Sequence, residues 1–333
     1  MGKRRIRKKQ ILKYGVIALL MVFLIGTALY FLQNWEKNQG FFPTHSEDDT
    51  AIVHNGQKYV PNDKIETFLV LGLDKFEGVH TGASYNNDKQ SDFLMLLVFD
   101  NQNKTSTALH INRDTMAKVN VLAIDGIEVV DTVTKQIALA HTYGNGKEVS
   151  CRNVADSVSE LLYGVQVKHF ISLTMDSVAV YNDLVGGVEL TVLDDFGKVD
   201  PTLVKGEKVL LKGEHALNYV RTRYGLEDST NSTRMQRQQQ YVNALLQKTK
   251  AKIEGDDEFI VDASLKMADF IVSDRSVTQL QELAKKFDEY KFEGIKTIDG
   301  ETKMGDEFIE FYPDNNSLKN IVVDLFYKPA KGS

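Results

Sequence analysis

The stretch Phe93-Leu-Met-Leu-Leu-Val-Phe99 decides the fold. It is apolar at every position, whereas a strand with one face in water alternates apolar and polar residues. A strand of this kind is covered on both faces, as in the sheets of α/β proteins. A mostly apolar run at 65–73 precedes it, and residues 105–111 return from a turn as the partner of a hairpin. The chain is therefore predicted to contain a covered central sheet.

Helical and strand patterns alternate around this sheet. The sequence predicts a second hairpin around Asp125-Gly126, strands at 167–174 and 188–193, and helices over about 133–142, 150–163, 175–185, 213–222 and, capped by Asn231 or Ser232, to about 251. Such alternation predicts a three-layer α/β domain over residues 63–251, with a mixed central sheet and helices on both faces. Residues 252–333 are expected as a C-terminal extension, with helices near 260–272 and 276–290 and a strand near 307–312.

The N-terminus has the pattern of a membrane anchor. Residues 1–13 carry seven Lys and Arg residues and no acid; subtracting them from the net charge of −6 leaves −13 on the rest. Tyr14–Leu32 has no charge and would span roughly 28 Å as a helix, close to the thickness of a bilayer core. We expect a cytoplasmic tail over 1–13, one transmembrane helix over 14–32 and an extracytoplasmic stalk over 33–62.

Other interpretations of this end are less favoured. A cleaved signal peptide would have a shorter apolar run, followed by small residues rather than by Tyr30, Phe31 and Trp35. A nucleic-acid site would use only the first thirteen residues of an otherwise acidic chain. The single cysteine, Cys151, excludes an intrachain disulfide, which is compatible with export from a bacterial cell.

Arginine is concentrated in one stretch, Arg221-Thr-Arg-Tyr-Gly-Leu-Glu-Asp-Ser-Thr-Asn-Ser-Thr-Arg234-Met-Gln-Arg237-Gln238. Beyond residue 13 the chain has seven arginines, and four of them lie here. The guanidinium group binds phosphate oxygens in pairs, so the cluster predicts a site for a multiply charged anion such as a diphosphate. The alternative is structural: arginines that interact with a helix C-terminus or form a solvated helix face.

Further polar residues stand at the ends of predicted strands, where α/β sheets bind ligands. Asp92 precedes the apolar strand, and Arg113 and Asp114 end its hairpin partner. Each has a structural alternative, a turn residue for Asp92 and an ion pair for the other two. His141 is predicted to be a hydrogen-bonded loop histidine, because no second histidine stands at metal-ligand spacing. We find no nucleophile elbow or P-loop.

Five motifs in this order resemble the LytR-CpsA-Psr family. They are Ser91-Asp92, Asn112-Arg-Asp-Thr115, Asp183-Leu-Val-Gly-Gly-Val188, Gly213-Glu-His-Ala-Leu-Asn-Tyr-Val-Arg-Thr-Arg223 and Arg234-Met-Gln-Arg-Gln-Gln239, and they cover roughly residues 65–250. Two positions depart from the family pattern. Gln90 stands where the family often has arginine, which is expected to thin a phosphate clamp. Asn112 stands where it often has proline, which is expected to change a turn.

The resemblance implies a membrane-anchored phosphotransferase of a Gram-positive-type bacterial envelope. Such enzymes move a glycopolymer (teichoic acid, capsule or another wall polysaccharide) from a polyprenyl diphosphate to peptidoglycan, with Mg²⁺ or Mn²⁺ and with the lipid in an apolar cleft. The implied catalytic residues are Asp92, Arg113, Asp114 and Arg221. The implied phosphate-binding residues are Arg113, Arg221, Arg223, Arg234, Arg237 and Gln238. Asp92 and Asp114 would hold the metal, or one of them would act as general base. The alternatives are a lipid diphosphate hydrolase and a non-catalytic, polymer-binding or regulatory envelope protein.

Overall fold

A computed structural model describes residues 51–74, 89–197, 199–223, 225–226, 230–256 and 258–330. The expected tail, the membrane helix and the stalk up to residue 50 lie outside these residues. Among the helices within them, none has the length and apolar character needed to span a bilayer.

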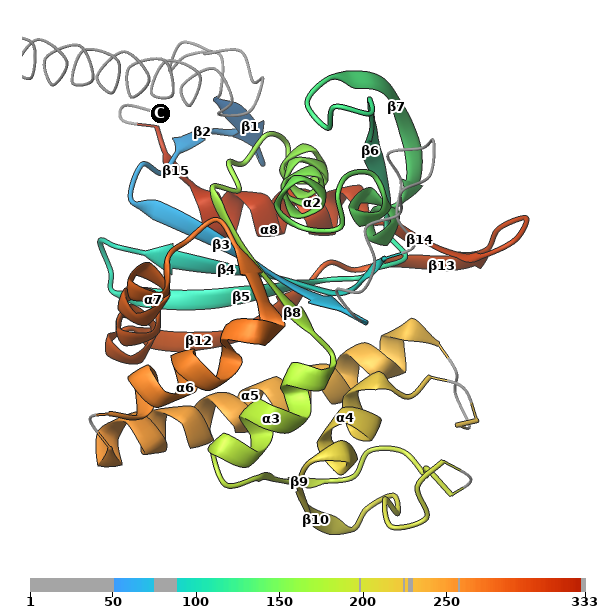
Figure 1. The fold of residues 1–333 in the computed structure, drawn as a ribbon. Helices are drawn as coiled ribbons and strands as arrows, with labels where there is room; N and C mark the ends of the chain where they lie inside the picture. The colour runs from blue at the N-terminus through green and yellow to red at the C-terminus, as the bar shows by residue number, and fades with distance from the viewer. Residues whose placement is uncertain are drawn as a thin grey trace, which may run out of the picture. The chain divides into compact units, whose positions relative to one another are not determined.

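The centre of the domain is a six-stranded mixed sheet (Figure 1). In spatial order its strands are β11 (Ile271–Ser273), β8 (His169–Thr174), β3 (Ile65–Leu73), β4 (Ser91–Asp100), β5 (Thr105–Ile111) and β12 (Lys291–Thr297). The pairs β3–β8 and β5–β12 are parallel, and the other three pairs are antiparallel. The predicted strand at 93–99 forms the middle of β4, and its predicted hairpin partner is β5.

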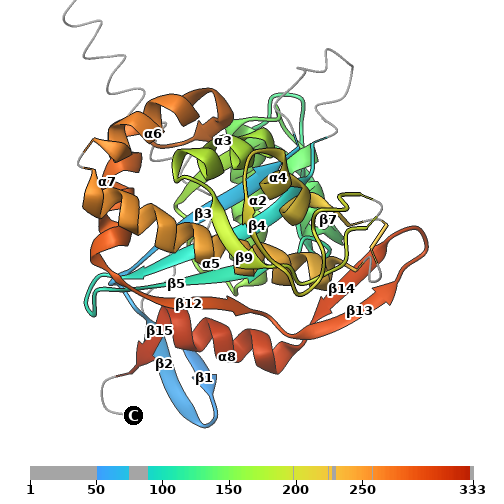
Figure 2. The ribbon, with the colours of Figure 1, turned by 90° about the horizontal axis from the view of Figure 1, so that it is seen from below.

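Helices cover both faces of the sheet, so the predicted three layers are confirmed. Helices α2 (Glu148–Leu161) and α8 (Asn315–Phe326) pack on one face, and their contacts with it form the largest core cluster (Figure 1). The other face carries α7 (Val277–Glu289), which closes a smaller aromatic cluster around Phe68, Phe99 and Tyr290. Helices α3 (Asp176–Leu184), α5 (Asn231–Gly255) and α6 (Phe259–Met267) lie on the same side (Figure 2).

A separate apolar cluster joins these last helices to α4 (Glu214–Arg221) and to the two-stranded sheet of β9 (Val188–Thr191) and β10 (Lys208–Leu211). Tyr219 of α4 and Tyr241 of α5 lie in its centre. The cluster fixes the angle between α4 and α5, the two helices that carry the arginine-rich stretch.

Three predictions about local structure are corrected. Residues 133–142 are not one helix: β7 (Val129–Gln136) pairs with β6 (Met116–Leu122), and only the 3₁₀ helix η1 (Ile137–Thr142) follows. The β-branched run Thr132-Val-Thr134 favours the strand. The end of the expected stalk forms a hairpin of β1 (Ile52–His54) and β2 (Gln57–Pro61). Its loop is Asn55-Gly56, both with positive φ, which is the residue pair typical of a two-residue hairpin turn.

The third correction concerns the C-terminal region. Residues 252–330 do not form an appended extension, because they supply both edge strands of the central sheet, β11 and β12, and the covering helix α8. They also contain the hairpin of β13 (Gly300–Met304) and β14 (Ile309–Pro313), and β15 (Tyr327–Pro329), which pairs with β2. The expected helix at 260–272 ends as α6 at Met267, and the strand expected near 307–312 is β14.

Candidate active site

Asp92 and Arg113 meet at one end of the β4–β5 hairpin. The register pairs Leu94 with Ile111, and extending it by two residues on each strand sets Asp92 opposite Arg113. Arg113 donates through Nη1 to Asp92 and through Nη2 to Gln90. The third nitrogen, Nε, lies 3.4 Å from Oδ1 of Asp114. One guanidinium thus holds both predicted carboxylates, and Gln90 adds a neutral acceptor where the family often has a positive charge.

Asp114 is the buried carboxylate of the site, with 2% of its side chain exposed. Its Oδ1 accepts a hydrogen bond of 3.0 Å from Nε2 of Gln136 at the end of β7. Its Oδ2 is buried and has no hydrogen-bond partner within the part of the chain that the structure describes. Burial raises the pKa of Asp114, and the nearby arginines 113, 223 and 234 oppose this rise. One carboxylate oxygen is therefore available to a cation or to an acceptor hydroxyl.

The first turn of α5 brings Arg234 to the same place. Arg234 is 5% exposed, and its Nε and Nη2 donate to Oδ1 of Asn231 at 3.0 and 2.6 Å. Asn231 in turn donates to Oδ1 of Asn112 at 2.6 Å. Across the described residues no carboxylate pairs with Arg234, whose partner is thus a neutral amide. Burial, with Arg113 and Arg223 nearby, lowers the pKa of Arg234 to about 10. A buried cation of this kind is strongly stabilised by a bound anion.

Arg237 and Gln238 bind groups of the chain itself in this structure, and the phosphate binding predicted for them stays a prediction. Arg237 is 1% exposed, and its guanidinium donates to Asp194 and lies over the ring of Phe196. The two side chains also donate to backbone carbonyl oxygens at the end of α4, those of Tyr219, Val220 and Thr222. The last carbonyls of a helix have no partner within it. Arg237 and Gln238 therefore fix the end of α4 and the position of the loop that follows.

Arg221 and Arg223 lie on that fixed segment. Arg221 is the last residue of α4, is 53% exposed and forms an ion pair of 2.7 Å with Asp74, which follows β3. Arg223 is half-buried and acts electrostatically on Asp114 and Arg234. The structure thus brings Asp92, Arg113, Asp114, Arg223 and Arg234 together and places Arg221 at the exposed rim beside Asp74.

Two buried histidines near this region are structural. His141 is hydrogen-bonded through Nδ1 to the carbonyl oxygen of Lys89 at 2.9 Å, as predicted, but it lies in the 3₁₀ helix η1 and not in a loop. Burial lowers the pKa of His141 to about 4 and that of His110 to about 3. The described residues contain no group of three or more His, Cys, Asp or Glu side chains arranged to hold a metal ion.

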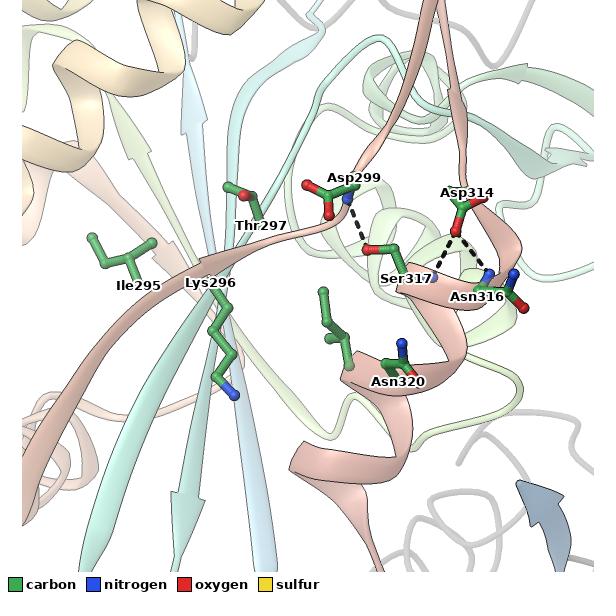
Figure 3. A pocket seen from close by; sticks show the side chains of 9 residues that line it. Ile295, Lys296, Thr297, Asp299, Asp314, Asn316, Ser317 and Asn320 are labelled. Carbon is green, nitrogen blue, oxygen red and sulfur yellow. Dashed lines mark hydrogen bonds between the residues drawn. The ribbon is translucent and has the colours of Figure 1, made fainter. Parts of the chain in front are cut away.

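An open hollow between β12 and α8 contains none of the predicted site residues (Figure 3). Asp314 accepts hydrogen bonds from the first backbone amides of α8, and Ser317 accepts one from the amide of Asp299. These polar groups therefore start α8 and hold the loop between β12 and β13 against it.

The contacts of Gln90, Asn112, Gln136, Asp194 and Asn231 were not predicted. Asn231 or Ser232 was expected to cap α5, but Thr230 occupies the cap position, and the side chain of Asn231 accepts from Arg234. Gln136 was not identified from the sequence, because residues 133–142 were predicted to form one helix. The departure at Asn112 supplies an acceptor oxygen for the side-chain amide of Asn231, which a proline at this position would not.

Residues 36–324 match the LytR_cpsA_psr family, and the chain belongs to it. It is 26% identical over 250 residues, 74% of this chain and 72% of the other, to a protein of Bacillus licheniformis named polyisoprenyl-teichoic acid–peptidoglycan teichoic acid transferase TagU. It is 24% identical over 332 residues, 96% of this chain and 78% of the other, to the Bacillus subtilis transferase TagV of the same kind. The crystal structure of a Streptococcus agalactiae protein shares the fold, with a TM-score of 0.63 and 19% identity over 79% of this chain and 86% of the other.

Proposed function

We propose that this protein is a membrane-anchored phosphotransferase that moves a glycopolymer from a polyprenyl diphosphate to peptidoglycan. An acceptor hydroxyl oxygen attacks the phosphorus that bears the sugar. The bridging P–O bond of the diphosphate breaks, polyprenyl phosphate leaves, and the hydroxyl proton passes to a base. Membership of the family and the names of the relatives support this class of reaction.

The observation that carries the proposal is the buried guanidinium of Arg234, which forms no ion pair with a carboxylate of the described residues and lies near Arg113 and Arg223. Arg113 is paired with Asp92 and Asp114. Arg223 and Arg234 therefore add positive charge to a partly desolvated site, and this charge favours a bound anion. A diphosphate is such an anion, and its transition state places more negative charge on the bridging and equatorial oxygens. Arg221, exposed at the rim, can exchange Asp74 for a phosphate oxygen at small cost.

Asp92 and Asp114 suit Mg²⁺ or Mn²⁺. Mg²⁺ is commonly held by one or two carboxylates together with substrate phosphates and water. The buried, unpartnered Oδ2 of Asp114 is the oxygen that such an ion would take among the described residues. A bound divalent ion would neutralise developing phosphate charge. Asp114 also has a raised pKa, a property of a group that can accept the proton of an acceptor hydroxyl.

The lipid is proposed to lie along the sheet face that carries α7. On β8 the side chains of the opposite face are buried, whereas those of this face are half-buried. On β3 and β4 this face is mixed, because Phe68, Met95 and Phe99 are buried. The half-buried apolar side chains of the three strands are Val70, Phe93, Leu97, Ile171 and Leu173. A polyprenyl chain would cover this apolar row while its diphosphate meets the arginines.

The anchor completes the proposal. The basic tail over 1–13 would stay in the cytoplasm, the helix over 14–32 would cross the membrane, and the folded domain would face the cell wall. That side of the membrane holds the peptidoglycan acceptor and the head groups of the lipid carriers.

The test uses the full chain in detergent micelles with a short-chain polyprenyl diphosphate sugar, Mg²⁺ and peptidoglycan oligomers, with products identified by mass spectrometry. The parent should form a phosphosugar adduct on the glycan. Arg221→Ala and Arg234→Gln should each lower kcat/KM about a hundredfold or more. Lys252→Ala removes an exposed charge at the far end of α5 and should be neutral.

Other outcomes would replace the proposal. Release of lipid phosphate and free phosphosugar without a glycan adduct would identify a hydrolase. Retention of the lipid without turnover, with every donor and metal tried, would identify a binding protein. Loss of affinity without loss of turnover in Arg221→Ala would contradict the proposed role of that arginine.

A further inference from the structure

The β13–β14 hairpin reaches the site at Asp114. The backbone amide of Phe311 in β14 donates to the carbonyl oxygen of Asp114 at 2.8 Å. Thr115 forms a parallel bridge with the same Phe311. The C-terminal region thus supports the turn that carries the catalytic carboxylate.

Gln136 makes a second connection between the same two parts. Its side chain is buried, with 9% exposed, and its Nε2 donates to Oδ1 of Asp114 at 3.0 Å and to the backbone oxygen of Ile309 at 2.7 Å. Both hydrogens of one amide group are therefore used. The Ile309 contact fixes the amide against the hairpin, and the amide in turn fixes Oδ1.

This arrangement determines which oxygen of Asp114 is presented. The terminal torsion of an aspartate is broad and close to two-fold, so an unheld carboxylate can exchange its two oxygens. Holding Oδ1 leaves Oδ2 as the oxygen that is buried and without a hydrogen-bond partner in the described structure. A neutral donor suits this position. A lysine would neutralise the carboxylate, and a glutamate would repel it.

We propose that Gln136 is a positioning residue that, braced by the β13–β14 hairpin, orients Asp114 so that its Oδ2 faces a divalent cation. The inference rests on the proposed function for the identity of the site, but it concerns metal affinity and not turnover. Outer-shell partners of metal-binding carboxylates contribute about ten- to hundredfold to metal affinity.

The experiment measures Mn²⁺ binding to the full chain in detergent micelles, by the electron paramagnetic resonance signal of free Mn²⁺. Gln136→Met keeps the side-chain volume and removes both donors, and it should weaken Mn²⁺ binding about tenfold or more. Gln247→Ala, an exposed glutamine on α5, is the matched control. Inorganic pyrophosphate binding in the presence of EDTA should stay within twofold of the parent, because the arginines are untouched.

A merely structural role would give another pattern, in which Mn²⁺ and pyrophosphate affinities fall together with the thermal midpoint. Gln136→Lys decides the matter if Gln136→Met does not fold. Its ammonium can bind Asp114 and should lower Mn²⁺ affinity without lowering pyrophosphate affinity.

Three results would overturn the inference: unchanged Mn²⁺ affinity in a folded variant, the structural pattern, or a parent that binds no Mn²⁺. Failure of the proposed function is seen separately, as a parent that binds Mn²⁺ but forms no glycan adduct.

Discussion

The side-chain amide of Asn231 lies 2.6 Å from Oδ1 of Asn112, and this contact joins the central sheet to α5 inside the candidate site. Asn112 precedes the Arg113–Asp114 turn, and its Oδ1 also accepts from the backbone amide of Asp114 at 3.0 Å. Asn231 passes the connection to Arg234. A change at Asn112 should therefore alter the positions of both the Asp114 carboxylate and the buried guanidinium of Arg234.

Asn112→Ala should lower the free energy of unfolding by about 1–3 kcal/mol, because it leaves buried donors without an acceptor. It should also weaken pyrophosphate binding, since Asn231 no longer fixes Arg234. Urea unfolding and calorimetric titration of the full chain measure the two effects. Asn320→Ala on the exposed side of α8 should change neither. Wild-type stability and affinity in Asn112→Ala would show that the contact has no energetic role.

Arg237 and Arg221 should give opposite results when truncated. Arg237→Ala breaks a buried ion pair and removes donors from the end of α4, so the free energy of unfolding should fall by about 3–5 kcal/mol. Arg221 is half-exposed, and its pair with Asp74 contributes at most about 1 kcal/mol, so Arg221→Ala should keep its stability and lose transfer. Comparing unfolding and transfer for both variants tests the assignment. It fails if Arg237→Ala is as stable as the parent.

The sequence predicted the central sheet because its signal is local and strong. An apolar run such as 93–99 is stable only as a strand covered on both faces. The antiparallel return at 105–111 then sets Asp92 beside Arg113. The arginine cluster was visible for a similar reason, because arginine is rare elsewhere in the chain. Residue type thus indicated the candidate site. The strand register accounts for the proximity of Asp92 and Arg113.

The roles within the cluster could not be predicted in the same way. Spacing on α5 does not distinguish Arg234, which faces the site, from Arg237, three residues later, which faces the carbonyl end of α4. That distinction depends on the angle between two helices, which tertiary packing of Tyr219 and Tyr241 determines. Strand β12 was not predicted. It pairs in parallel with β5, and the two strands are far apart in the sequence, so no local pattern indicates the pairing.

His110 should make stability depend on pH. Its pKa is about 3 in the folded chain against an ordinary 6.5, so below pH 6.5 the unfolded state binds a proton that the folded state does not. The free energy of unfolding should therefore decrease as the pH is lowered, by up to about 1.4 kcal/mol per pH unit for one proton. Most of this change lies between pH 6.5 and about 3.

His110→Gln should remove this contribution while leaving an acceptor for Gln239. Denaturant unfolding of the parent and the variant at several pH values measures the two slopes. His141 and the carboxylates contribute to both proteins, so the difference between the slopes reports His110. Equal slopes would contradict burial of His110 as a neutral ring.

Cys151 should resist alkylation while the chain is folded. It lies on α2 within the largest core cluster, and burial raises the pKa of its thiol to about 12 from an ordinary 9.0. The thiolate is the reactive form, so at pH 8 its population should be roughly a thousandfold lower than in the unfolded chain. Iodoacetamide should leave the folded chain unmodified and label it fully in concentrated guanidinium chloride, with Cys151→Ser unlabelled in both. Labelling of the folded chain at the unfolded rate would mean that α2 leaves the sheet readily, and with it the packing that supports η1 and the nearby end of the candidate site.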